Sequence, residues 1–261
     1  MRQPNGHGEM EFETLLREDG QTIAYLRRDG KPPNVLWLGG FKSDMGGTKA
    51  EALDAWAARR GHAYLRFDYF GHGRSSGQFR DGTITRWRDD ALAVLDRLTE
   101  GPQILVGSSM GAWVALLAAR LRPERMAGLL LLAPAADFTE SLVWARMSPE
   151  IRREIMEKGE WQRPSAYGDG PYPITRALIE DGRKHMILGA PVAVGCPVHI
   201  IQGMQDPDVP WQHAMKLMEQ LSGDPVLTLI KSGDHRLSTT ADLRRIEQAL
   251  EGLLADIGAP L

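Results

Sequence analysis

The sequence contains a single cysteine, Cys196, among its 261 residues, which excludes an internal disulfide. A lone cysteine is typical of a protein kept in a reducing compartment. The chain also lacks an apolar run long enough to cross a membrane, and residues 1–20 lack the apolar core of a secretory signal. These absences lead us to expect a cytoplasmic protein without a membrane span.

Charge of one sign is also scarce, because 31 Lys and Arg residues nearly balance 34 Asp and Glu residues and leave a net charge of −3. Proteins that bind nucleic acid or anionic membranes usually carry a basic excess. The sequence has no Walker A motif, no Gly-x-Gly-x-x-Gly that opens a helix and no cysteine–histidine cluster with metal spacing. We therefore expect no nucleic-acid partner, no cofactor and no metal, while the oligomeric state stays open.

The main motif that is present is Gly-x-Ser-x-Gly, at Gly107, Ser109 and Gly111. The apolar run from Ile104 to Val106 precedes it and predicts a short buried strand, and the helix-forming stretch from Ala112 to Arg120 follows it. Strand, sharp turn and buried helix are the surroundings of a nucleophile elbow, whose serine sits in a strained turn. We predict that Ser109 is a catalytic nucleophile and that both glycines permit close backbone approach.

The same pattern occurs a second time, from Gly73 to Gly77, with Ser75 at its centre. The polar segment from Gln78 to Gly82 follows it and predicts a loop, not a helix. A short motif matches by chance often enough that its surroundings must decide between two copies. We therefore predict a structural role for Ser75.

Apolar runs and helical periodicity alternate along most of the chain, which predicts a mostly parallel sheet with helices on both faces. The sheet begins with a predicted hairpin of two strands, from Glu11 to Arg17 and from Gln21 to Arg28. Thr48 is a candidate N-cap for the first predicted helix. The remaining predicted strands run through Val35–Leu38, Ala63–Phe67, Ile104–Val106, Met126–Ala133, Val198–Gln202 and Val226–Ile230. The predicted helices run through Thr48–Arg60, Thr83–Leu98, Ala112–Arg120, Trp211–Leu221 and Ala241–Ile257.

The alternation breaks from about residue 136 to residue 190. There a predicted helix from Ile151 to Lys158 and a second one from roughly Ile174 to Met186 flank a turn-rich, aromatic stretch. We predict a small cap at 136–190, inserted into a core formed by residues 1–135 and 191–261. Such an insertion lies over the strand ends where open α/β sheets bind ligands, although a purely superficial excursion is the alternative. Substrate contacts are predicted for Trp144 and Trp161. Other large apolar side chains of the segment are Met147, Met156, Tyr167, Tyr172 and Met186.

A serine nucleophile needs a histidine base, and the base needs a carboxylate to orient it. Of seven histidines, His235 alone lies in a polar loop directly after a late strand, whereas His72 lies in a turn near the site. Asp206 follows the strand ending at Gln202 and is the predicted acid, with Asp208 as its nearest rival. The predicted triad is thus Ser109, Asp206 and His235.

An oxyanion hole needs two backbone N–H donors. Met110 follows the nucleophile directly and is the first predicted donor. The second should come from the loop after the strand ending at Leu38, where we choose Phe41. Asp68 is predicted to hold this loop or the elbow through hydrogen bonds, with an ordinary turn-forming aspartate as the equal alternative.

Several motifs and stretches carry a resemblance to a known family. They are Asp68-x-x-Gly71-x-Gly73-x-Ser75, Gly107-x-Ser109-x-Gly111, Gly203-x-x-Asp206-x-x-Val209-Pro210, Gly233-Asp234-His235, and the stretches Gly40–Ala50, Arg66–Tyr69, Gly101–Ser109 and Val209–Trp211. These residues resemble the α/β-hydrolase superfamily over nearly the whole chain. Within it, the sequence is similar to the branch of acyl-protein thioesterases and mycophenolic acid acyl-glucuronide esterases. The resemblance implies an α/β-hydrolase fold and a triad in the chain order Ser, Asp, His.

The activity expected from these features is cleavage of carboxylic esters or thioesters through an acyl-enzyme on Ser109. The substrate would be a small acyl ester or thioester, or an acylated protein. Two alternatives stay open, a serine peptidase on the same fold and a non-catalytic ligand-binding protein.

Overall fold

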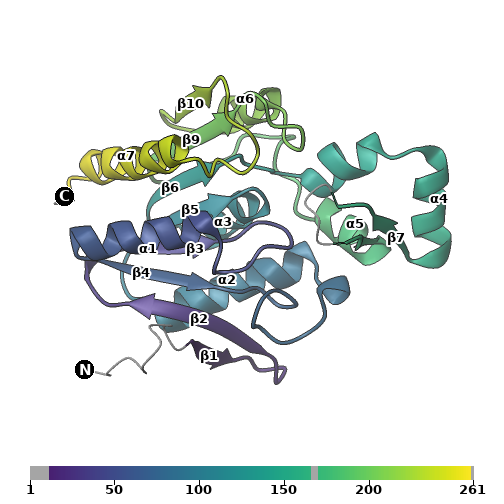
Figure 1. Cartoon of the computed structure of the whole chain (residues 1–261), viewed down its shortest axis with the longest axis horizontal. Helices are drawn as coiled ribbons and strands as arrows, with labels where there is room; N and C mark the ends of the chain where they lie inside the picture. The colour runs from purple at the N-terminus through teal and green to yellow at the C-terminus, as the bar shows by residue number, and fades with distance from the viewer. Residues whose placement is uncertain (1–11, 166–169, 260–261) are drawn as a thin grey trace.

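The computed structural model describes residues 12–165 and 170–259, and a mixed sheet forms its centre (Figure 1). The eight strands follow the order β1-β2-β4-β3-β5-β6-β9-β10. Their bounds are β1 Glu13–Leu16, β2 Thr22–Arg28, β3 Lys31–Leu38, β4 His62–Phe67, β5 Gln103–Ser108, β6 Met126–Leu132, β9 Val198–Gly203 and β10 Val226–Ile230. Strands β4, β3, β5, β6, β9 and β10 pair in parallel, whereas β1 and β2 pair antiparallel at one edge. The predicted sheet and opening hairpin are confirmed.

Helices cover both faces of the sheet, as predicted. Helices α1 (Thr48–Arg60) and α7 (Thr240–Asp256) pack on one face, and α2 (Ile84–Leu98), α3 (Met110–Leu121) and α6 (Trp211–Gln220) pack on the other. Helix α3 is buried on nearly all sides, because it lies between β5, β6 and α2. Its composition of Ala, Leu and Val matches that position, since a helix without a solvent face gains from apolar residues all around.

The residue that caps the amino end of a helix follows the local sequence pattern in α2 but not in α1. Thr83 caps α2 by accepting a hydrogen bond from the Arg86 amide. For α1, however, the prediction of Thr48 as N-cap is wrong. Gly47 occupies the extended N-cap position and Thr48 is the first helical residue. Glycine is tolerated at an N-cap because it adopts the extended conformation freely, although it offers no side-chain acceptor.

Between β6 and β9 the chain leaves the sheet and forms a separate group of short elements (Figure 1). These are a π-helical turn Thr139–Val143, α4 (Pro149–Lys158), the antiparallel pair β7 (Glu160–Arg163) and β8 (Tyr172–Thr175), and α5 (Arg176–Arg183). The second helix was expected to begin at about Ile174, but that residue belongs to β8. The group lies at the carboxyl ends of the parallel strands. Tyr167, part of the predicted aromatic stretch, is outside the described residues.

The two ends of this insertion meet at one buried carboxylate. Asp137 lies just after β6 in the left-handed region, with φ 56°. Its Oδ1 and Oδ2 atoms accept hydrogen bonds from the amides of Ile187 and Leu188, at 2.8 and 2.9 Å. The outgoing and returning chains are therefore held side by side at the edge of the core.

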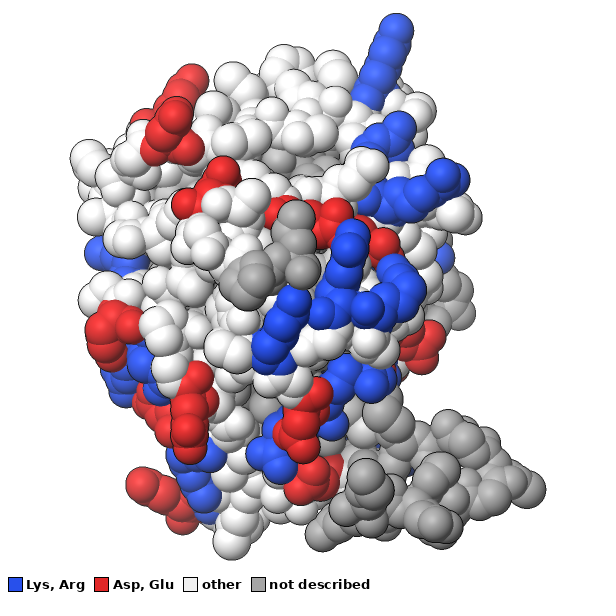
Figure 2. All heavy atoms as spheres, turned by 90° about the vertical axis from the view of Figure 1, so that its left-hand side faces the viewer, with Lys and Arg blue, Asp and Glu red and all other residues white. Residues whose placement is uncertain are grey.

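The face of the molecule away from the insertion carries both signs of charge in close proximity (Figure 2). Two of the ion pairs in this part join α1 to α7, from Arg59 to Glu247 at 2.9 Å and from Arg60 to Glu251 at 2.5 Å. This mixture of charges agrees with the small net charge of the chain. The described part of this face therefore lacks the continuous positive surface that attracts nucleic acid. Within residues 12–165 and 170–259, no helix is both long and apolar enough to cross a bilayer.

Candidate active site

Ser109 occupies the sharp turn between β5 and α3. Its backbone has φ 55° and ψ −116°, a conformation that is costly for a residue with a side chain. Two backbone hydrogen bonds fix the turn to β6 and the chain that follows it. The Ser109 amide donates to the Leu132 carbonyl at 2.8 Å, and the Ser109 carbonyl accepts from the Ala135 amide at 3.2 Å. These hydrogen bonds hold the strained backbone conformation in place. The turn places the Ser109 hydroxyl at the end of the sheet, beside the first turn of α3.

The two glycines of the motif are required by contact distances. A Cβ atom on Gly111 would lie 2.1 Å from the Leu38 carbonyl oxygen, and one on Gly107 would lie 2.5 Å from the Gly111 carbonyl oxygen. Both contacts are with backbone, which cannot move aside as a flexible side chain can. Strand β3, strand β5 and helix α3 thus approach one another closely only because these positions lack side chains.

Ser75, in the second copy of the motif, has both of its hydrogen-bonding functions engaged. Its hydroxyl donates to the Asp68 carbonyl at 2.5 Å and accepts from the Ala24 amide at 2.8 Å. These bonds tie the turn after β4 to strand β2. The hydroxyl therefore serves the packing of the sheet edge, in keeping with the structural role predicted for it.

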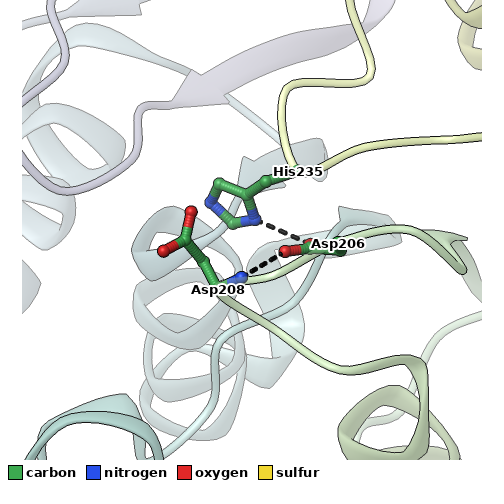
Figure 3. A group of neighbouring side chains, drawn as sticks. All are labelled: Asp206, Asp208 and His235. Carbon is green, nitrogen blue, oxygen red and sulfur yellow. Dashed lines mark hydrogen bonds and ion pairs between the residues drawn. The ribbon is translucent and has the colours of Figure 1, made fainter. Parts of the chain in front are cut away.

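His235 and Asp206 contact each other at the ends of adjacent loops. The imidazole Nδ1 lies 2.7 Å from Asp206 Oδ2 (Figure 3). The Asp206 side chain is completely buried, while 18% of the His235 side chain is exposed. The other carboxylate oxygen, Oδ1, accepts hydrogen bonds from the amides of Asp208 and Val209, at 2.9 and 2.8 Å. The carboxylate is thus fixed in orientation and directs one ring nitrogen, which leaves Nε2 for chemistry.

The loops after β9 and β10, which carry Asp206 and His235, pack closely against each other at two glycines. The Gln205 amide donates to the Gly233 carbonyl at 2.9 Å. A Cβ atom on Gly203 would lie 2.3 Å from the same oxygen, so the loops after β9 and β10 pack backbone against backbone. Because two parallel neighbouring strands end side by side, residues far apart in sequence arrive at one corner of the sheet.

Asp208 lies beside the pair without replacing Asp206. Its carboxylate lies on the other side of the imidazole from Asp206 (Figure 3). It forms a long ion pair with Arg163 of β7, at 3.9 Å. One potential ligand atom each from Asp206, Asp208 and His235 lie within 4.8 Å of one another, so the three could hold a cation. The hydrogen bonds that Asp206 already makes favour a role in orienting His235 over a role as a cation ligand.

A cavity of about 410 Å³ contains the predicted groups in one place. Ser109, Met110, Phe41 and His235 all line it. Several apolar residues of its wall come from the insertion and the chain leading into it, namely Ala135, Phe138, Leu142, Val143, Tyr172 and Ile174. The core contributes Trp37, Phe41, Met110 and Val209. This volume falls in the range of small-molecule sites, and an apolar wall beside a polar corner suits an acyl group.

Trp144 and Trp161 are placed elsewhere by the fold. The guanidinium groups of Arg152 and Arg183 lie over the Trp144 ring, 5.4 and 5.0 Å from its centroid. Trp161 lines a separate hollow between Arg80 and α4. Neither residue is among the described residues that line the Ser109 cavity, and contact between either side chain and the substrate stays a prediction. Tyr172, from the same segment, does line it.

Asp68 holds two loops near the site. Its carboxylate accepts hydrogen bonds from the Met45 amide at 2.6 Å and the Arg74 amide at 2.8 Å. Gly73 must lack a side chain there, because a Cβ atom would lie 2.1 Å from the carboxylate. Burial raises the pKa of Asp68, and the two amide hydrogen bonds oppose that rise. Asp68 therefore connects the turn after β4 to the loop that contains Phe41.

Sequence reasoning did not single out Lys49, which lines the polar side of the cavity. Its ammonium group donates to the carbonyl of Arg236, the residue after His235. Burial lowers the pKa of Lys49 to about 8, although Asp234 and Asp242 act in the opposite direction. The position at the start of α1 gave no sequence signal, since a lysine on an amphipathic helix is usually exposed.

The chain is similar to known proteins in both sequence and structure. A model described as the alpha/beta hydrolase family matches residues 36–248. The chain is 39% identical over 242 residues to the mitochondrial palmitoyl-protein thioesterase ABHD10 of Mus musculus, covering 92% of this chain and 81% of that protein.

Two solved structures are similar over almost the same length. A crystal structure from Agrobacterium vitis S4 has a TM-score of 0.89 and 45% identity, covering 93% of this chain and 98% of that one. The structure of alpha/beta hydrolase domain-containing protein 10 from mouse has a TM-score of 0.88 and 37% identity, covering 95% and 100% of the two chains.

Proposed function

Because this chain belongs to the alpha/beta hydrolase family, we propose that it is a serine hydrolase that cleaves thioesters and carboxylic esters through an acyl-enzyme on Ser109. The observation that supports the proposal most directly is the shared cavity. Ser109 in its strained turn and His235, held by Asp206, both line it. Hydrolase activity follows from the family, whereas the nucleophile and its partners are our proposal.

In the proposed first step, the Ser109 oxygen attacks the acyl carbonyl carbon while His235 Nε2 takes the hydroxyl proton. The carbonyl π electrons move onto oxygen, and the amides of Phe41 and Met110 donate hydrogen bonds to that oxyanion. The intermediate then collapses, the bond to sulfur or oxygen breaks, and the leaving group departs as thiol or alcohol with the proton from His235. Asp206 stabilises the imidazolium during both transfers.

The second step repeats this chemistry with water. His235 removes a proton from water as it attacks the acyl-enzyme, and a second oxyanion forms at the same two amides. Collapse returns the proton to Ser109, releases the carboxylic acid and restores the free enzyme. No step requires a metal or a redox cofactor.

The substrate class proposed is an activated acyl group, such as a thioester or an aryl ester. The mouse relative is named a palmitoyl-protein thioesterase, which favours thioesters here. A thiolate departs with little protonation, so a positioned nucleophile and two oxyanion donors suffice, whereas an amine must be protonated as it leaves. We propose residues 136–190 as a cap over this site, because its Leu142, Val143 and Tyr172 form part of the cavity wall.

A matched pair of substrates tests this assignment. One acyl group is presented as a thioester and as an anilide, and kcat/KM is measured for both, together with fluorophosphonate labelling of Ser109. We expect labelling at Ser109 and a strong preference for the thioester. Preference for the anilide would support a peptidase instead. Absence of both labelling and turnover would indicate a binding protein.

The cellular location is a separate proposal. The single cysteine favours a reducing compartment, and we propose the cytoplasm. The mammalian relatives carry the word mitochondrial in their names. Fractionation of the producing cells, with detection of the chain in each fraction, distinguishes the two compartments.

A further inference from the structure

The loop after β3 turns tightly around Phe41, the residue proposed to donate its amide to the oxyanion. The Gly40 carbonyl accepts hydrogen bonds from the Ser43 amide at 3.2 Å and from the Ser43 hydroxyl at 2.8 Å. Lys42 has φ 59°, a left-handed conformation that glycine would adopt more readily. A tight turn with a strained third residue needs additional bonds to persist.

His72 supplies one such bond from a different part of the chain. The Lys42 amide donates a hydrogen bond to His72 Nε2, with 3.1 Å between the nitrogens. Since a backbone N–H can only donate, Nε2 must carry a lone pair. Nδ1 lies 3.1 Å from the Phe70 carbonyl, which can only accept, so the proton lies on Nδ1. The two contacts together define a single neutral tautomer.

The imidazole is held in this orientation by packing. His72 is only 4% exposed. The rings of Tyr69, Phe79 and Trp87 lie edge-on to it, at centroid distances of 5.8, 5.1 and 5.3 Å. Desolvation lowers the pKa of His72 to about 4, against the opposing effects of the Phe70 carbonyl and the Asp44 charge. The ring therefore stays neutral, and remains an acceptor, at ordinary pH.

Phe41 packs against the same aromatic group. Its ring lies 4.9 Å from Phe79 and 5.7 Å from Trp87, measured between centroids. The peptide bond before Phe41 is fixed through the Gly40 carbonyl, and the peptide bond after it is fixed through the Lys42 amide. With both neighbouring peptides held, the direction of the Phe41 N–H is set before substrate arrives.

We propose that His72 is a positioning residue for the oxyanion hole, which holds the Lys42 amide through its Nε2 lone pair and thereby directs the Phe41 N–H at the acyl oxygen. The inference rests on the proposed serine-hydrolase function. It assigns a role in the reaction to a residue that does not line the cavity. Preorganised donors are effective because they need no rearrangement as charge develops, so loss of this bond should affect the transition state more than substrate binding.

The test uses amide side chains of two lengths. A glutamine carbonyl reaches the position of the histidine Nε2, whereas an asparagine side chain ends near the position of Nδ1. We therefore expect His72→Gln to retain most of kcat. We expect His72→Asn to lower kcat by roughly 10- to 100-fold, part of the loss seen when an oxyanion donor is removed, with KM changed by no more than about threefold.

A transition-state analogue separates this role from a purely structural one. A trifluoromethyl ketone carrying the same acyl chain forms a tetrahedral adduct with the serine and places an oxyanion in the hole. Its inhibition constant should rise in His72→Asn by the same factor by which kcat/KM falls. The control is His62→Leu, which removes another buried histidine. His62 stacks on Trp56 at the first residue of β4, the strand end opposite the site, so both constants should stay unchanged.

Three results would overturn the proposal. They are full kcat in His72→Asn, an equal loss in Gln and Asn variants, and an inhibition constant that does not follow kcat/KM. If the variants fail to fold, ¹⁵N NMR of the wild-type histidines decides, because the proposal requires the neutral Nδ1–H tautomer of His72 at pH 7. A wild-type chain that neither hydrolyses the thioester nor reacts with a fluorophosphonate would refute the serine-hydrolase function, while the NMR result still tests the hydrogen bond itself.

Discussion

Asp206 Oδ2 lies 2.7 Å from His235 Nδ1, while Asp206 Oδ1 accepts hydrogen bonds from the amides of Asp208 and Val209. An asparagine at position 206 would present an N–H group to one of these donors and would favour the wrong histidine tautomer. We expect Asp206→Asn to lower kcat by roughly 10²–10⁴. Asp208→Asn keeps the backbone amide that contacts Asp206 and should stay close to wild type. If the two variants exchanged these behaviours in steady-state assays, Asp208 would be the acid.

The two serine motifs give a second prediction. We expect Ser109→Ala to lower kcat by roughly 10⁴–10⁶ and to abolish fluorophosphonate labelling in intact-mass spectra. Ser75→Ala should keep both. It should instead lower the free energy of unfolding by about 1–3 kcal/mol, because the Ala24 amide and the Asp68 carbonyl lose their partner. Labelling that survives in Ser109→Ala and disappears in Ser75→Ala would reverse the assignment.

A third prediction concerns the elbow glycine at position 111. In Gly111→Ala the new methyl group would meet the Leu38 carbonyl oxygen at 2.1 Å. We expect urea denaturation to show a loss of at least about 1–3 kcal/mol, with loss of activity as the elbow is displaced from β3. The matched control is Gly189→Ala, because a Cβ atom there has no neighbour within 4 Å. A surface change of that kind should stay within about 0.5 kcal/mol of wild type.

The cavity wall predicts how acyl length is selected. Leu142→Trp should fill part of the cavity and lower kcat/KM for an octanoyl thioester by roughly tenfold or more, while an acetyl thioester changes little. Trp161→Ala serves as the control, since Trp161 lines a different hollow. Equal loss on both substrates in Leu142→Trp, with the fold intact by circular dichroism, would argue against acyl binding at this wall.

The neutral state of His72 also predicts a dependence of stability on pH. Its pKa is about 4 in the folded protein and near 6.5 when unfolded, so the unfolded chain binds the proton more tightly between these values. The free energy of unfolding should therefore fall as pH decreases from 6.5 to 4, by on the order of 3 kcal/mol from this residue. Comparison with His72→Leu isolates the effect from that of Asp90, whose pKa burial raises to about 6. A constant difference between the two proteins would contradict the prediction.

The mostly parallel sheet and the serine elbow were predictable from the sequence, because the alternation of strands and helices adds up along the chain and the elbow motif lies within one short stretch. The apolar run of β5 and the apolar helix after it identify the elbow within one short stretch. The order of strands and helices then brings Asp206 and His235 to neighbouring loops. Their roles in catalysis stay predictions, although the hydrogen bond between them has the expected geometry.

The insertion was harder to predict, for physical reasons. Strand β7 has only four residues, Glu-Trp-Gln-Arg, whose pattern is too short to distinguish a strand from a loop. Trp144 and Trp161 are large apolar residues, but the Trp144 ring lies against arginines of α4 and α5, and Trp161 lines a hollow together with Arg80. The hydrogen bond from the Lys42 amide to His72 Nε2 joins residues 30 positions apart, and nothing in the turn around His72 specifies that donor.

The buried carboxylate of Asp137 has a consequence for how such chains diversify. Because it binds the amides of Ile187 and Leu188, the chain departs from the core and returns to it at one point. The segment between can therefore be replaced by the corresponding segment of a relative without moving the strands that carry Ser109, Asp206 and His235. From the proposed role of the insertion as a cap, we expect a chimera joined at this point to take the substrate range of the donor and the reaction of the host.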